Sequence, residues 1–144
     1  MYENVKPDEI CPVIPSPSRD PRRCDNLLME YRELLFDRLR VEPHNFIYTC
    51  EHNPFETYRQ IYRTIRRYED ALKPLHGCKI VISAVSSKLL SIGALLAAYE
   101  ASKAGYMIGV SHIETHGYSM NTPDGNNQSK DLFSLWLAGE CYDE

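Results

Sequence analysis

The sequence lacks several features that mark special classes of protein. Its five cysteines form no Cys-x-x-Cys pair, so we expect neither a disulfide framework nor a structural zinc site, and a reducing, cytoplasmic compartment fits best. The charged N-terminus has no apolar core of the kind that a secretory signal needs. The longest apolar stretch, around residues 89–99, is broken by Ser91 and Gly93 and is too short to span a bilayer. We therefore expect a soluble protein with no membrane partner.

The chain also has no excess of basic residues. It carries 16 Lys and Arg against 20 Asp and Glu, which gives a net charge of −4. This balance argues against an extended nucleic-acid-binding surface, although a few arginines can still converge in a local pocket. With 144 residues, 43% of them hydrophobic, we expect one domain over residues 10–144 after a flexible lead-in over residues 1–9.

Hydrophobic periodicity predicts strands that alternate with helices. Strands are expected over residues 10–14, 46–50, 79–84 and 106–111. Helices are expected over residues 21–40, 54–72, 89–104 and 129–137, with Asn53 and Ser86 or Ser87 as caps and Gly105 as a stop signal. The continuously apolar run at 79–84 is typical of a strand that is buried on both faces.

This alternation favours an α/β fold, a Rossmann-like three-layer sandwich with a small, mainly parallel sheet. Four strands make a small sheet. The chain is therefore expected to be a fragment of a longer protein or to associate as a homodimer. In such a sheet the loops that follow the strands meet at one edge, where ligands bind. Those loops are residues 16–19, 50–53, 85–88 and 111–116.

One of these loops has the chemistry of an anion site. The strand at 79–84 runs into Ser86, Ser87 and Lys88, where a helix is expected to begin. Free amide groups at a helix N-terminus attract anions, hydroxyls add donors, and a lysine adds positive charge. We expect a phosphate or a nucleotide there; the alternative is that the serines only cap the helix and Lys88 is solvated. The P-loop and Gly-x-Gly-x-x-Gly patterns are both absent, and no cofactor is expected.

The same region resembles the CRISPR-associated Rossmann fold (CARF) family, which senses cyclic oligoadenylates. In that family a buried strand ends in a Gly-Gly-Thr/Ser-Lys-like turn, followed by a helix rich in small residues. Ser87 and Lys88 match the last two turn positions, while Val85 and Ser86 stand in place of the glycines. The resemblance covers about residues 46–112. It implies a sensor for a nucleotide second messenger that works as a symmetric homodimer, with the ligand across the interface.

A second resemblance is to sugar-phosphate isomerase-type domains, in which a strand leads into a serine-rich phosphate turn. Ser83, Ser86 and Ser87, with the Ala-x-x-Ala-Gly helix end at 101–105, are similar to that arrangement. The Ser-Gly-x-Thr turn of those domains is absent. This resemblance implies a phosphorylated sugar as the ligand.

His112, Glu114 and His116 follow the strand expected at 106–111. If this segment is extended, its period of two places both imidazoles and the carboxylate on one face. They could then contact a ligand or act as acid–base residues of an enzyme. A metal site is a further alternative, although three ligands so close in sequence are cramped around one ion, and we expect none. The remaining alternative is an ordinary polar loop.

Polar residues after the other two strands are further candidates for ligand binding. Ser18 and Arg19 precede the first expected helix, and Arg19 could clamp a phosphate through two hydrogen bonds or pair with a surface carboxylate. Glu51 and His52 follow the second strand, where they could contact a ligand or pack around the helix cap.

The helix expected from residue 54 carries four arginines opposite its apolar face. These are Arg59, Arg63, Arg66 and Arg67. A charge run of this kind usually lies on a solvated helix face, and we interpret it so.

These observations lead to three functional hypotheses. The first is a ligand-binding sensor for a phosphate-bearing small molecule, such as a cyclic oligonucleotide, held by Ser86, Ser87, Lys88 and Arg19. The second is an enzyme that acts on a phosphorylated sugar or nucleoside with His112 and Glu114. The third is a structural or assembly module that binds no small ligand.

Overall fold

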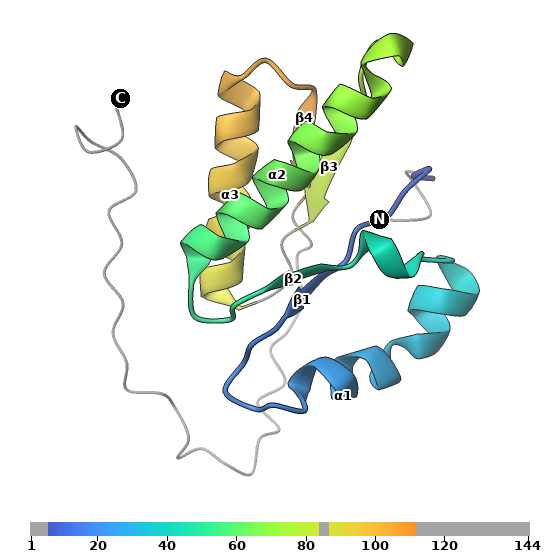
Figure 1. Ribbon diagram of the computed structural model, residues 1–144, viewed down its shortest axis with the longest axis vertical. Helices are drawn as coiled ribbons and strands as arrows, with labels where there is room; N and C mark the ends of the chain where they lie inside the picture. The colour runs from blue at the N-terminus through green and yellow to red at the C-terminus, as the bar shows by residue number, and fades with distance from the viewer. Residues whose placement is uncertain (1–5, 84–86, 112–144) are drawn as a thin grey trace, which may run out of the picture. The chain divides into compact units, whose positions relative to one another are not determined.

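The computed structural model describes residues 6–83 and 87–111 of the chain (Figure 1). All of these residues belong to the first of two units, residues 1–113, and the second unit spans residues 114–144. The helix expected over 129–137 lies outside the described residues. The expectation of one domain over residues 10–144 stays a prediction.

The first two strands form a parallel pair. β1 (Val13–Pro15) lies beside β2 (Ile47–Thr49), with Val13 opposite Ile47 and Pro15 opposite Thr49. Ile14 is buried, and so is Thr49. The strand predicted from the apolar run at residues 10–14 therefore exists, but it begins at Val13.

The connection between β1 and β2 corrects the single long helix expected over residues 21–40. It consists of α1 (Arg23–Glu30), the π-helical segment η1 (Glu33–Arg38) and the short 3-10 helix η2 (Pro43–Asn45). The amide of Leu39 donates at 2.9 Å to the carbonyl of Leu34, five residues earlier, which is the spacing of a π-helix. No residue of α1 or η1 is buried. Because little packs against this stretch, its leucine spacing does not hold it in one regular helix.

α2 (Pro54–Leu72) begins as the sequence predicts. The side-chain oxygen of Asn53 accepts hydrogen bonds from the amides of Phe55 and Glu56, at 3.1 and 3.2 Å. Pro54 occupies the first helical position, where its missing N–H does no harm. The helix ends in the 3-10 turn η3 (Lys73–Leu75), followed by His76 and Gly77, both with positive φ.

The second strand pair flanks the third helix. β3 (Ile80–Ser83) leads toward α3 (Lys88–Lys103), and β4 (Ile108–Ser111) returns in parallel with β3, with Ile80 opposite Ile108. Gly105 has a φ of +84° and stops α3 in the left-handed conformation, as predicted.

The expectation that the strand at 79–84 is buried on both faces is wrong. Val81 is 37% exposed, and Val110 on the neighbouring strand is 49% exposed. Ile80, Ile82 and Ile108 point the other way and pack against the core. Among the described residues, therefore, α2 and α3 cover only one face of the β3–β4 pair.

The core lies between α2, α3 and the strands. Its buried members are Ile61, Ile65, Ala94, Ala97 and Ala101. α2 and α3 lie side by side (Figure 1) and approach closely at Gly93, where an added Cβ would overlap the carbonyl oxygen of Pro54 and lie 2.6 Å from the Cβ of Thr57. A glycine at this position is required by the close approach of two backbones.

The two strand pairs share this core. Val13 of β1 packs against the same cluster of buried residues as Ile80 and Ile82 of β3. Within residues 6–83 and 87–111, however, β1 and β2 form one two-stranded sheet and β3 and β4 form another. The structure is thus mixed α/β with two small parallel sheets. None of the described helices is both long enough and apolar enough to cross a membrane.

Candidate functional site

Two of the loops that the sequence places at one edge are tied together by main-chain hydrogen bonds. The amide of Ser16 donates to the carbonyl of Thr49 at 2.8 Å, and the amide of Glu51 donates to the carbonyl of Pro17 at 3.2 Å. The segment after β1 therefore runs directly beside the segment after β2. Ser18, in this segment, donates its hydroxyl to the carbonyl of Asp20 at 2.5 Å.

The third loop reaches the same end of the domain through helix packing. Pro54 is the first residue of α2, and its carbonyl contacts Gly93, which lies five residues after Lys88, the first residue of α3. Five residues of α-helix span about 7.5 Å. The N-terminal ends of α2 and α3 therefore lie near one another, as Figure 1 also shows. We call residues 16–19, 50–53 and 87–88 the strand-end rim.

Ser87 and Lys88 have separate roles in this rim. The hydroxyl oxygen of Ser87 accepts a hydrogen bond from the amide of Leu90 at 3.5 Å, so Ser87 is the N-cap of α3. Lys88 is exposed at the first helical position. The cap predicted at Ser86 or Ser87 is thus Ser87, while Ser86 lies outside the described residues.

Glu51 is held by an arginine that we did not expect to contact it. Its carboxylate is 10% exposed and lies 2.7 Å from the guanidinium of Arg23 in α1. This ion pair ties the start of α1 to the end of β2. Since its charge is matched by Arg23, Glu51 acts as a structural anchor of the rim. Arg19, the arginine favoured from the sequence, is exposed.

His52 has one buried nitrogen without a partner. Its Nε2 is shielded from solvent and makes no hydrogen bond to any described residue. The residue is half-buried beside Asn53, the cap of α2. An unsatisfied buried imidazole nitrogen is uncommon in proteins.

The structure does not test the remaining predicted site residues. His112, Glu114 and His116 lie outside the described residues, and so does the segment 84–86. Within residues 6–83 and 87–111, no group of three or more His, Cys, Asp and Glu side chains could hold a metal ion.

Two cysteines, Cys78 and Cys24, have raised pKa values and are therefore weak nucleophiles. Burial, followed by a hydrogen bond to Glu69, raises the pKa of Cys78 to about 11, and its Sγ lies 3.5 Å from that carboxylate. Burial, followed by the charge of Asp25, also raises the pKa of Cys24. A thiol with a raised pKa stays protonated at neutral pH and is a weak nucleophile.

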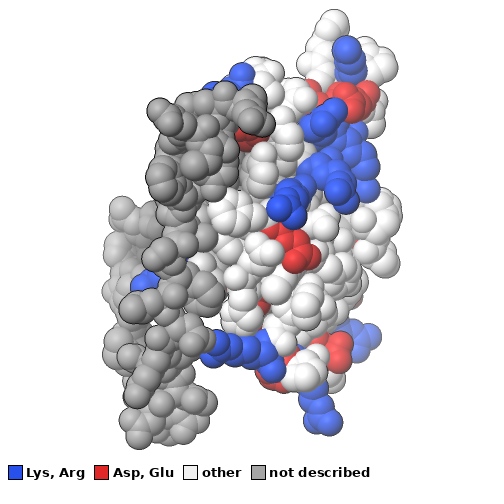
Figure 2. Space-filling model, turned by 60° about the vertical axis from the view of Figure 1, so that its left-hand side comes forward, with Lys and Arg blue, Asp and Glu red and all other residues white. Residues whose placement is uncertain are grey.

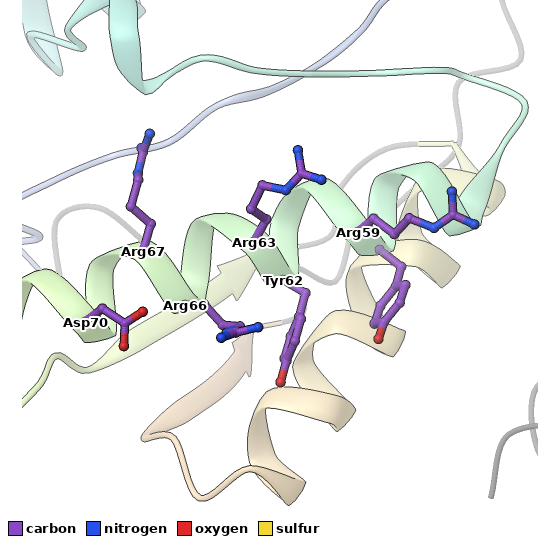
Figure 3. Close-up of a pocket in the computed structure, with 7 residues that line it drawn as sticks. Arg59, Tyr62, Arg63, Arg66, Arg67 and Asp70 are labelled. Atoms are coloured by element: carbon purple, nitrogen blue, oxygen red, sulfur yellow. The ribbon is translucent and has the colours of Figure 1, made fainter. Parts of the chain in front are cut away.

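A hollow of about 530 Å³ lies on α2, where we expected only a solvated face (Figure 3). Its walls are six cationic or aromatic side chains and one carboxylate: Tyr58, Arg59, Tyr62, Arg63, Arg66, Arg67 and Asp70. We call these seven residues the arginine–tyrosine surface. Figure 2 shows Lys and Arg side chains gathered into a patch on this acidic chain, with Asp and Glu beside them. The missed signal is a Tyr-Arg pair repeated four residues later, at 58–59 and 62–63.

The two tyrosines of this surface are neutral donors. Their rings stack with centroids 5.9 Å apart and an interplanar angle of 19°. Burial is the main cause that raises the pKa of Tyr58, and Glu100 on α3 adds to it. Burial likewise raises the pKa of Tyr62, with Tyr106 and Glu100 as further causes. Both phenols therefore keep their protons at neutral pH.

Comparison with known proteins does not extend this description. No protein-family model and no curated protein sequence matches the chain.

Proposed function

We propose that this domain binds a phosphate-bearing small molecule at the strand-end rim, with a nucleotide second messenger such as a cyclic oligonucleotide as the ligand class. The observation that carries the proposal is the position of Lys88. It is exposed at the first position of α3, at the same end of the domain as the start of α2. An anion there would meet a lysine and the positive ends of two helices.

The chemistry of the surrounding rim supports an anionic ligand. In the first turn of α3, the amide of Leu90 donates to the hydroxyl of Ser87 and that of Ser91 to its carbonyl, whereas the amides of Lys88 and Leu89 meet no acceptor among the described residues. The one carboxylate described at the rim, Glu51, is matched by Arg23 and so does not oppose an anion. His52, half-buried beside Asn53, is a further polar side chain of the rim.

A lysine pair tests this proposal. Binding of a cyclic oligonucleotide and of a sugar phosphate is measured by calorimetry for the parent protein, Lys88→Ala and Lys79→Ala. Lys79 is also exposed but precedes β3, so it lies at the opposite end of that strand. We expect Lys88→Ala to weaken binding at least tenfold and Lys79→Ala to leave it unchanged. Equal affinity in the parent and in Lys88→Ala would overturn the proposal.

We also infer that the two strand pairs belong to one Rossmann-like sheet in a three-layer sandwich. Support comes from Val13 of β1 and Ile80 of β3, which pack against the same cluster of buried residues from α2 and α3. Through-space contacts between main-chain protons of residues 13–15 and 80–83 in NMR spectra test it. Their absence in the folded protein would leave two separate sheets.

A symmetric homodimer is the remaining part of the proposal. The exposed valines of the β3–β4 pair, Val81 and Val110, support it because an uncovered apolar sheet face favours association. Sedimentation of the parent protein and of Val110→Lys tests this point. We expect a dimer that dissociates in the variant; a monomeric parent would contradict it.

A further inference from the structure

We propose that the arginine–tyrosine surface of α2 binds a short stretch of single-stranded nucleic acid, three or four nucleotides long, by its phosphates and bases. This inference goes beyond the small-molecule site at the strand-end rim and does not depend on it. It also concerns a local patch, so the net charge of −4 does not oppose it.

The first argument is the charge that the surface leaves unmatched. All four arginines are exposed. In the part of the chain that the structure describes, none of them lies within 4.0 Å of a carboxylate oxygen, and Arg67 instead lies over the ring of Tyr68 at 5.5 Å. Arg59, Arg63 and Arg67 follow each other at a spacing of four, where like charges repel and destabilise a helix. A bound polyanion would relieve this repulsion.

The second argument is the length of the surface. From Arg59 to Arg67 the helix advances eight residues, which is about 12 Å. In a strand whose bases are stacked, a phosphate follows about every 3.4 Å along the helix axis, so three or four phosphates of such a strand fit this span. In Figure 3, Arg63 and Arg67 project from one side of α2 and Arg66 from another. The planar forks can therefore reach phosphates along both sides of the hollow.

The third argument distinguishes a nucleic acid from an acidic peptide. Tyr58 and Tyr62 pack against the core with part of each ring and line the hollow, and aromatic rings are the surfaces on which unpaired bases stack. Asp70 also lines it, and Glu100 lies close enough to act on both phenols. A carboxylate in the wall repels either anion, but it accepts hydrogen bonds from base amino groups, which an acidic peptide does not offer.

The experiment uses the full chain and labelled hexanucleotides of single-stranded DNA and RNA with mixed sequence. Fluorescence anisotropy gives the affinity at several salt concentrations for the parent, for Arg63→Gln/Arg66→Gln and for a control, Arg32→Gln/Arg38→Gln. The control removes the same charge from exposed positions outside α2. We expect the α2 variant to bind at least tenfold more weakly, and the control to match the parent. Since the salt slope is about 0.7 per phosphate for single strands, the α2 variant should lose about 1.4 from it.

A tyrosine pair separates base contacts from charge alone. Tyr62→Phe keeps the ring and should keep the affinity, whereas Tyr62→Leu should weaken binding about fivefold, with thermal unfolding used to confirm that both variants fold. The proposal is overturned if the α2 variant and the control variant bind with equal affinity. It is also overturned if the parent does not bind at 50 mM salt. Displacement of the strand by inorganic polyphosphate or poly-glutamate as readily as by unlabelled strand overturns it too, because a nonselective anion patch would then explain the charge.

Discussion

α2 and the segment α1–η1 both carry hydrophobic residues at helical spacing, yet they differ in structure. α2 contributes Ile61 and Ile65 to a buried core, and α3 contributes alanines with no exposed surface. In α1 and η1 no residue is buried, and Leu34 is 42% exposed. The difference teaches that most helical stability in a protein comes from a packed face, and that a periodic face without a partner does not maintain a regular helix.

The largest test of this contrast is a pair of truncations, Ile65→Ala and Leu34→Ala. Ile65 is 3% exposed and lies in the core, so its truncation should destabilise the fold by about 3 kcal/mol. Leu34 is already half in solvent, and we expect its truncation to lower the free energy of unfolding by less than about 1 kcal/mol. Urea unfolding measures both. Similar losses in the two variants would show that α1–η1 packs as well as α2.

A second prediction concerns the closeness of α2 and α3. Gly93→Ala should cost about 2 kcal/mol, because the new methyl group meets the backbone carbonyl of Pro54, which cannot rotate away. Gly109→Ala is the control, since nothing lies within 4 Å of the Cβ that it would add. We expect the control to unfold within about 0.5 kcal/mol of the parent. Equal stability of Gly93→Ala and the parent would mean that the helices do not touch at this point.

The third prediction concerns the buried link between β2 and α2. The hydroxyls of Thr49 and Thr57 lie 2.8 Å apart, and neither residue is exposed. Thr57→Val should leave the hydroxyl of Thr49 unsatisfied and destabilise the fold by about 1–2 kcal/mol. Thr64→Val, where a half-buried hydroxyl donates to the carbonyl of Gln60, should have a smaller effect. Thermal unfolding of both variants gives the comparison.

The smallest expected effect is a pH dependence of the folding stability, which comes from Cys78 just after the C-terminal end of α2. The pKa of Cys78 is raised from its ordinary value of 9.0 to about 11, so the folded state holds the thiol proton more tightly than the unfolded state. The resulting stabilisation is present below pH 9 and is lost as the pH rises toward 11. Urea midpoints between pH 8 and 11 should fall less steeply for Cys78→Ala than for the parent. The raised pKa of Tyr68, about 12, affects both proteins alike. Parallel curves would contradict the prediction.

Much of the local structure was predictable because its signals act over a few residues. Asn53 caps α2 and Gly105 ends α3 through main-chain geometry that neighbouring residues complete. The apolar face of α2 follows from the spacing of its side chains. The strand at 80–83 was also predicted, but its burial was not, because exposure of Val81 depends on what covers the outer face.

The candidate site likewise contains residues that the sequence predicted and residues that it did not. Ser87 and Lys88 were recognisable because a hydroxyl and a lysine follow a strand at the start of a helix. The pairing of Glu51 with Arg23 was not, since it joins residues that chain direction alone does not bring together. The arginine–tyrosine surface was read as a solvated face, because a charge pattern carries no information about the hollow beside it.

The sequence by itself determined where helices and strands begin and end in the capped parts of the chain, since caps, glycines and side-chain periodicity are properties of neighbouring residues. Tertiary structure alone decided which faces are covered. It placed the start of α2 against Gly93 and left Val81 and Val110 exposed. The physical reason is that burial and ion pairing arise between segments far apart in the chain, whose meeting depends on the packing of the whole core.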